Sequence, residues 1–239
     1  MISKFDLKEY FYENASVISI FIFFVLMTAF FSLSADAFLT QRNLLNLLRQ
    51  SAPILIAATA MTFVITTGGI DLSVGSILAI VNATCAILLQ YQFDWVLVIF
   101  ILIFIGIICG LVQGYFIAFE GLPAFIVTLA GMSAIRGIAL LMTEGFTIPI
   151  DKNLGIIFLG RGWLLGIPVP AIIAVVVIII GYVLLNNTKY GQYVTGIGSN
   201  NEAVRRSGVN IKLYTLITYV FCGISASIGG IIIAARLGS

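Results

Sequence analysis

Seven apolar stretches, each near the length that crosses a lipid bilayer, constrain this chain more than any other feature. They cover residues 16–34, 52–67, 72–90, 95–119, 124–142, 168–185 and 213–235. About 20 apolar residues in a helix span the roughly 30 Å hydrocarbon core, where only helices and closed barrels satisfy every backbone polar group. The sequence therefore predicts an all-α, polytopic transmembrane helical bundle with about seven membrane segments.

The composition supports a chain that uses lipid as its solvent and excludes several classes of function. Hydrophobic residues make up 61% and charged residues 9%, against roughly 25% charged residues in soluble domains. The net charge of +2 is too small and too scattered to indicate a nucleic-acid partner. Histidine is absent, and Cys85, Cys109 and Cys222 lie inside apolar stretches without metal-ligand spacing. We therefore expect no metal site, no cofactor and no hydrolase activity.

The second apolar stretch ends in a sequence that breaks a helix. As a helix, residues 52–67 would rise only about 24 Å, less than the bilayer core. The run TTGGIDLSVGS at 66–76 follows, in which Gly68 and Gly69 permit left-handed backbone and Asp71 or Ser73 can cap the next helix. We predict a broken helix near residues 68–71, within membrane depth. Such breaks line a transport path in many carriers, although Asp71 can equally be only a helix cap.

Arg136 is the basic residue that lies well inside an apolar stretch. Its side chain can pair with Asp71 or line a polar path, or it can extend to the outer membrane interface as long basic side chains do. Asn82 and Gln113 are weaker polar candidates inside apolar stretches. The candidates for a translocation path are therefore Gly68, Gly69, Asp71, Ser73, Asn82 and Arg136.

Gly106, Gly110 and Gly114 follow one another at four-residue spacing in the fourth apolar stretch. On a helix this spacing forms a flat face that lets a neighbouring backbone approach closely. Close helix packing is the favoured interpretation of these glycines.

The loop 186–212 is long, polar and basic, and it contains a pattern typical of a short capped helix at 199–208. Ser199 and Glu202 match a capping box, and Gly208 suits the left-handed residue that ends a helix. Arg205 and Arg206 lie near the negative end of that helix. A polar helix of two turns has no apolar reason to persist alone, so we expect it to bind a partner unless it is a solvated loop. Its basic residues place the loop and the N-terminus on the cytoplasmic side.

These residues resemble the ribose-type sugar permeases of bacterial ABC importers, a family that also includes galactose, xylose and autoinducer-sugar permeases. The resemblance is carried by TTGGIDLSVGS at 66–76, LPAFIVTLAGMSAIRG at 122–137 and GQYVTGIGSNNEAVRRSGVNI at 191–211. The third run is similar to the family's coupling loop, whose pattern is Glu-Ala-Ala, three residues and Gly. Glu202, Ala203 and Gly208 match it, and Val204 replaces the second Ala.

The resemblance implies one transmembrane permease domain over residues 1–239, with a cytoplasmic coupling helix at 199–208, in the bacterial inner membrane. It implies three partners: an ABC ATPase subunit, a periplasmic or extracellular sugar-binding protein, and a second permease subunit. Because the chain lacks a GxxxxGK[ST] phosphate loop, ATP hydrolysis is expected on a separate chain. The expected ATPase-coupling residues are Ser199, Asn201, Glu202, Ala203, Arg205, Arg206 and Gly208.

Two other functions fit parts of the sequence. Related permeases continue through further membrane segments, so the chain is expected to be truncated at its C-terminus, which leaves a non-transporting membrane subunit as one alternative. An ion-coupled secondary transporter would also use a broken helix and a membrane acid such as Asp71. The capped polar helix and the absence of a second membrane acid favour the importer.

Overall fold

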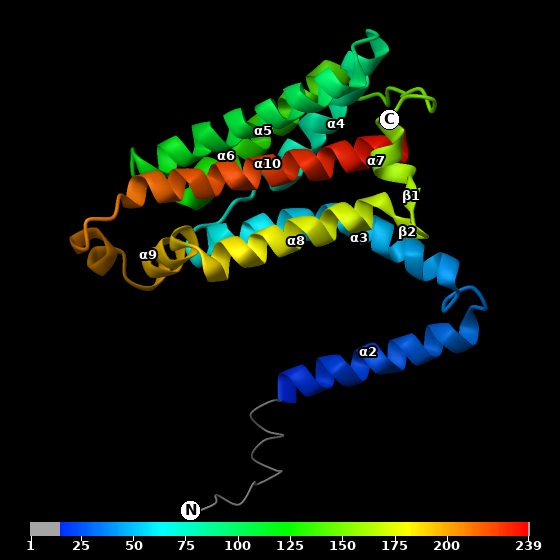
Figure 1. Ribbon diagram of the computed structural model, residues 1–239, viewed down its shortest axis with the longest axis horizontal. Helices are drawn as coiled ribbons and strands as arrows, with labels where there is room; N and C mark the ends of the chain where they lie inside the picture. Colours follow the sequence, from blue (N-terminus) through cyan, green and yellow to red (C-terminus); the bar gives the residue numbers. More distant parts are fainter. Residues whose placement is uncertain (1–14, 239) are drawn as a thin grey trace, which may run out of the picture. The chain divides into compact units, whose positions relative to one another are not determined.

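A computed structural model describes residues 15–238 of the protein (Figure 1). The chain divides between Leu47 and Leu48 into two compact units. The helices are α2 (Ala15–Ser34), α3 (Gln41–Thr66), α4 (Val74–Gln90), α5 (Trp95–Ala118), α6 (Ala124–Thr143), α7 (Ile157–Arg161), α8 (Val169–Asn187), α9 (Lys189–Arg206) and α10 (Ile211–Leu237). Strands β1 (Trp163–Leu164) and β2 (Ile167–Pro168) pair as a small antiparallel hairpin.

The predicted polytopic helical bundle is confirmed. Within residues 15–238, six helices are long and apolar enough to cross a membrane, namely α2, α3, α5, α6, α8 and α10. The 17-residue helix α4 is apolar but shorter. Each of the seven apolar stretches of the sequence thus lies on a separate helix.

The first unit contains α2 and the first turns of α3. In the link between these helices, the Asn43 side-chain amide donates a hydrogen bond of 2.8 Å to the Phe38 carbonyl. The rings of Phe31 and Phe38 stack with their centroids 5.7 Å apart. These local contacts fix the turn by which the chain enters α3.

Helix α3 differs from the short second segment expected from the sequence. It is 26 residues long and begins at Gln41, so the expected length is wrong. The Thr40 hydroxyl accepts the Asn43 N–H at 3.3 Å and caps the first turn. A search for apolar residues alone misses these polar first turns. At about 1.5 Å per residue the helix rises about 39 Å, which is enough to cross the bilayer core.

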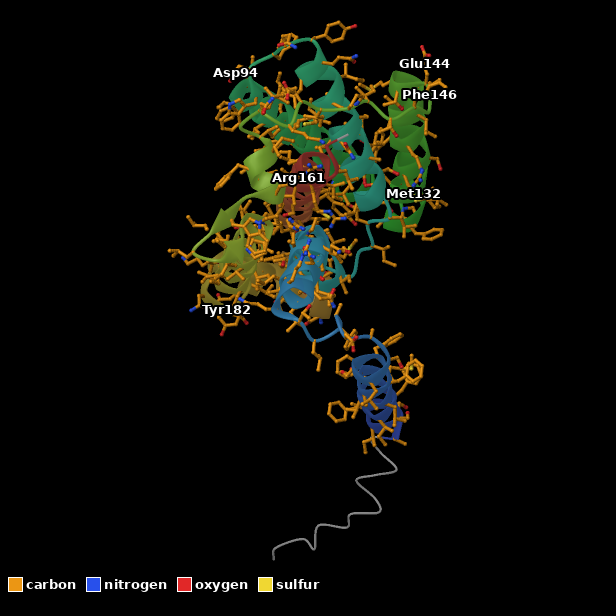
Figure 2. The ribbon with its side chains drawn as sticks, turned by 90° about the vertical axis from the view of Figure 1, so that its right-hand side faces the viewer. Asp94, Met132, Glu144, Phe146, Arg161 and Tyr182 are labelled. Atoms are coloured by element: carbon orange, nitrogen blue, oxygen red, sulfur yellow. The ribbon has the colours of Figure 1, made fainter. Side chains whose placement is uncertain are left out.

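Helix α10 is the central helix of the second unit. It lies between the pair α5 and α6 and the pair α3 and α8, as Figures 1 and 2 both show. Glycines on α5 make this position possible, because a Cβ added at Gly110 would lie 2.7 Å from the Val220 Cα atom. At Gly114 it would lie 3.1 Å from the Leu216 carbonyl oxygen. The predicted close-packing face of α5 is confirmed, and its partner is α10.

A side chain of α7 and a backbone N–H of the preceding loop hold the last turn of α10. Arg161, labelled in Figure 2, donates from Nε to the Arg236 carbonyl and from Nη2 to the Leu237 carbonyl, each at 2.8 Å. The Ile150 N–H donates to the Gly238 carbonyl at 2.8 Å. Carbonyl groups in the last turn of a helix have no partner within the helix, so these three bonds satisfy groups that would otherwise need water.

Replacing Gly110 by alanine should destabilise the second unit, whereas the same change at Gly137 should not. A methyl group at Gly110 meets the backbone of α10, and overpacking of this kind costs about 1 to 3 kcal/mol. Gly137, inside α6, has open space where its Cβ would be. Thermal unfolding of the purified proteins in detergent measures the difference. Equal midpoints for Gly110→Ala and Gly137→Ala would contradict the packing described.

Candidate functional site

The candidate site begins where α3 ends in a broken helix. Gly68 has a φ of 80°, and its N–H donates to the Ile65 carbonyl at 2.9 Å, while the Gly69 N–H donates to Val64 at 3.0 Å. This pair of bonds is a Schellman motif, which requires a left-handed residue and so favours glycine at position 68. Residues 67–73 then run without helix to the start of α4. The predicted break near residues 68–71 is confirmed.

Gly69 is required for a different reason, which is its contact with α10. A Cβ at this position would lie 2.5 Å from the Tyr219 hydroxyl oxygen. That hydroxyl, on a side chain that is 1% exposed, donates to the Ile70 carbonyl at 3.5 Å. The Thr128 hydroxyl of α6 lies 3.4 Å from the same carbonyl. The break is therefore held by α6 and α10 together.

Asp71, Ser73 and Gln113 form a buried group that we call the polar cluster. Their exposed fractions are 3%, 0% and 4%. One Asp71 carboxylate oxygen accepts both the Ser73 N–H at 2.9 Å and the Ser73 hydroxyl at 2.6 Å. Because the hydroxyl has a single proton, it accepts in turn from the Gln113 side-chain amide at 2.8 Å. The polar cluster ties the chain before α4 to α5.

The polar cluster corrects the expected capping of α4. Ser73 occupies the N-cap position, but its side chain makes no capping bond to the helix, and it faces Asp71 instead. Asp71 accepts the N–H of Ser73 itself. The Ser73 hydroxyl donates to this carboxylate in a charge-assisted bond and accepts from Gln113, and these two partners orient its oxygen away from the N–H groups that a cap would accept. Gln113, only a weak candidate in the sequence, is the third member.

Arg136 does not pair with Asp71, so that possibility is wrong. The ion pairs described within residues 15–238 both involve Glu202, and Arg136 forms none with a residue of that range. Arg136 and Asn82 instead line one cavity of about 320 Å³ between α4 and α6. The structure thus separates the path candidates into two groups. Gly68, Gly69, Asp71 and Ser73 lie at the break, and Asn82 and Arg136 lie at this cavity.

The predicted coupling helix is the second half of α9. We call residues 200–208, from the kink to the glycine that follows the helix, the coupling segment. The cap of this segment differs from the expected one. The backbone kinks at Asn200, which has φ −156° and ψ 90°. The Asn200 side-chain oxygen accepts the Ala203 N–H at 3.0 Å, whereas the Ser199 hydroxyl donates to the Thr195 carbonyl. The Ser199–Glu202 capping box is therefore wrong, because Asn200 caps one position later. Gly208 ends the segment with the left-handed φ of 81° that was predicted.

The Glu202 side chain hydrogen-bonds to two arginines and not to the Ser199 backbone. Its carboxylate accepts from Arg205 at 2.9 Å and from Arg206 at 3.1 Å. Hydrogen bonds from Arg205 first, and then from Arg206, lower the Glu202 pKa below its ordinary value. Such charge-assisted bonds are stronger than one to a neutral N–H, which explains why the carboxylate prefers them. The segment presents an exposed, polar surface.

The first half of α9, just before the kink at Asn200, lies directly against the broken helix. A Cβ at Gly198 would collide with the Thr66 carbonyl, so the two backbones are in contact. A cavity of about 230 Å³ lies beside this contact, and Gly68, Gly69, Asn201 and Tyr219 are among its lining residues. Gly198 and Tyr219 were not identified from the sequence. A glycine inside a helix lowers helix stability by about 1 kcal/mol relative to alanine. A glycine at position 198, inside a helical pattern, could therefore have indicated a close packing contact.

Comparison with known proteins agrees with this geometry. Residues 43–239 match the family described as the permease component of the branched-chain amino acid transport system. The chain belongs to this family of transport permeases. The ribose import permease of Haemophilus influenzae is 34% identical to this permease over 99% of the chain and 73% of its own length. The ribose import permease of Bacillus subtilis is 39% identical over 87% of the chain and 65% of its own length.

A xylose transport system permease of Haemophilus influenzae is 31% identical over 95% of the chain and 77% of its own length. No solved structure matches the chain. The protein is thus a multi-pass inner-membrane permease component of an ABC importer, and it is not itself an enzyme.

Replacing Asp71 by leucine should destabilise the permease, whereas asparagine should be tolerated. Leucine leaves the buried Ser73 N–H without an acceptor, and each such donor costs about 1 to 3 kcal/mol. Asparagine keeps a side-chain oxygen at the same place. Thermal unfolding in detergent, with the yield of monodisperse protein, measures both variants. If Asp71→Leu unfolds at the wild-type midpoint, the polar cluster does not hold the break.

Proposed function

We propose that this permease forms the membrane path of an ATP-driven importer for a small sugar. Relatives that match it are named as import permeases for ribose, as a xylose transport permease and as a galactofuranose transporter permease. The observation that carries the proposal is the coupling segment, an exposed polar helix that continues directly from the part of α9 packed against a broken membrane helix. Such a helix needs a partner, and a separate ATPase is the partner that an importer permease requires.

We propose that the ATPase binds the exposed surface of the second half of α9 and the turn that follows. Its residues are Ser199, Asn201, Glu202, Ala203, Arg205, Arg206 and Gly208. Movement of this surface can reach the break through Gly198, which precedes it in α9 and contacts the Thr66 carbonyl. Close-packed contacts of this kind compress little and therefore transmit displacement.

Asp71 and Ser73 support the broken helix and do not contact sugar in this proposal. Both are buried, and their hydrogen bonds join each other and Gln113. The same burial argues against an ion-coupled carrier, which needs an acid that a transported ion can reach. Residues 1–239 act as one permease domain in this proposal. A second permease subunit completes the path, and a periplasmic or extracellular sugar-binding protein delivers the substrate.

Replacing Gly208 by valine should uncouple the permease from its ATPase. A β-branched residue at a φ of 81° is strained by about 1 to 3 kcal/mol, which distorts the end of the coupling segment. Gly166, at the tip of the hairpin, has a similar φ of 77° and open space around it, so Gly166→Val is the matched control. We expect Gly208→Val to insert normally but to lose ATPase copurification and ATP-driven uptake together. Wild-type copurification and uptake would refute the assignment.

A cysteine placed at Asn201 should react with thiol reagents only from the cytoplasmic side. The basic coupling loop predicts this orientation. Leu165, which is 95% exposed at the hairpin tip, lies at the other end of the second unit from α9 (Figure 1) and is the matched control. In spheroplasts, an impermeant reagent added outside should modify Leu165→Cys and spare Asn201→Cys. The reverse pattern would invert the proposed topology.

A further inference from the structure

A second polar site lies away from the coupling segment, in the cavity between α4 and α6. The cavity has a volume of about 320 Å³, which falls in the range of small-molecule sites. Asn82 enters it from α4 and Arg136 from α6, while Phe146 and Thr147 line it from the loop after α6. Figure 2 shows Phe146 at the end of α6 that leads into this loop. The cavity thus reaches the end of the bundle opposite α9.

Alanines make the space on both walls. Ala79, Ala83 and Ala86 line the cavity from α4, and Ala139 lines it from α6. The three alanines of α4 are spaced by four and three residues, so they lie on one face of the helix. Larger side chains on this face would fill the cavity. The face of α4 turned toward Arg136 is therefore both small and, at Asn82, polar.

The polar groups of this cavity suit a ligand that both donates and accepts hydrogen bonds. Arg136 offers guanidinium donors and forms no ion pair with any residue between 15 and 238. Asn82 offers a donor and an acceptor. The Thr143 hydroxyl donates to the Ala139 carbonyl at 3.1 Å, so it presents lone pairs to the cavity. An inorganic anion could use only the donors, whereas sugar hydroxyls use both kinds of group.

Distance from the helix ends argues that Arg136 is more than a basic side chain extending to the interface. Along the helix axes, Asn82 lies about 12 Å before the last residue of α4, and Arg136 lies about 10 Å before the last residue of α6. An arginine that only reaches for the interface needs no polar group on the facing helix. Two polar side chains that face one cavity at similar depth indicate a water-filled site, because ionisable groups inside membranes mark such paths.

We propose that this cavity binds a monosaccharide, with Arg136 and Asn82 hydrogen-bonding adjacent sugar hydroxyls and Phe146 covering an apolar face of the ring. The site would bind sugar on its way through the permease, at the end of the bundle opposite the coupling segment. This role in transport rests on the proposed function. It gives Arg136 a role in binding sugar, separate from the role of the broken helix in coupling.

Protection of an introduced cysteine tests this site in membrane vesicles that hold the permease with its partner subunits. Thr147→Cys reports on the cavity, and Ala79→Cys is a second reporter if the first variant is not produced. Tyr91→Cys is the control, because Tyr91 is 73% exposed and lies outside the cavity lining. D-ribose, D-xylose or D-galactose should slow modification of Thr147→Cys by a small thiosulfonate several-fold. Betaine at equal osmolality should not, and Tyr91→Cys should react equally throughout.

Arg136→Gln and Asn82→Leu, each combined with a reporter, should abolish the protection by sugar. The proposal is overturned if no sugar changes the rate at either reporter, or if inorganic phosphate protects better than every sugar. Uptake measured in the same vesicles separates the two claims. ATP-driven uptake without protection refutes this site alone, whereas protection without ATP-driven uptake of any sugar refutes the importer and leaves the site standing.

Discussion

Close backbone contact between α5 and α10 is the interaction on which the rest of the structure depends. Lipid chains are as apolar as leucine, so helices in a membrane associate through tight packing and hydrogen bonds and not through the hydrophobic effect. Gly106, Gly110 and Gly114 remove the side chains that would keep these two helices apart. Of the membrane-length helices in the described residues, α10 is the most enclosed, because 61% of the residues in its apolar 18-residue stretch are buried. It can then support α4, the break and α9 around it.

The break is in contact with α10, α9 and α5 at once. Tyr219 of α10 fills the space that Gly69 leaves, and Gly198 lets α9 approach the end of α3. The polar cluster fastens the other side of the break to α5. Each of these contacts uses either a missing side chain or a buried hydrogen bond, and together they bury the irregular backbone in protein, as a break at membrane depth requires. The cavity proposed to bind a sugar lies apart from these contacts, at the opposite end of the bundle.

The sequence predicts the helices and the break because both depend on local patterns. Apolar length identifies each membrane helix, and the Gly68-Gly69 pair marks the end of α3. The polar start of α3 escapes an apolar search, and the choice of Asn200 over Ser199 as a cap depends on where the backbone kinks. The other contacts that the sequence does not predict join residues far apart in the chain. Tyr219 and Ile70 are 149 positions apart, and neither the Gly198 contact nor the failure of Arg136 to reach Asp71 follows from spacing along the chain.

The three bonds made by Arg161 and Ile150 give α10 two unlike ends. At one end, the last carbonyls accept hydrogen bonds from α7 and from the loop before it. The other end follows the coupling segment after only the short turn at residues 207–210. Glycine-mediated packing along α5 and the bonds from Arg161 both resist movement of α10, and the bonds act only at its last turn. In the proposed importer, a displacement that enters from the coupling segment would therefore reach α10 at its less restrained end.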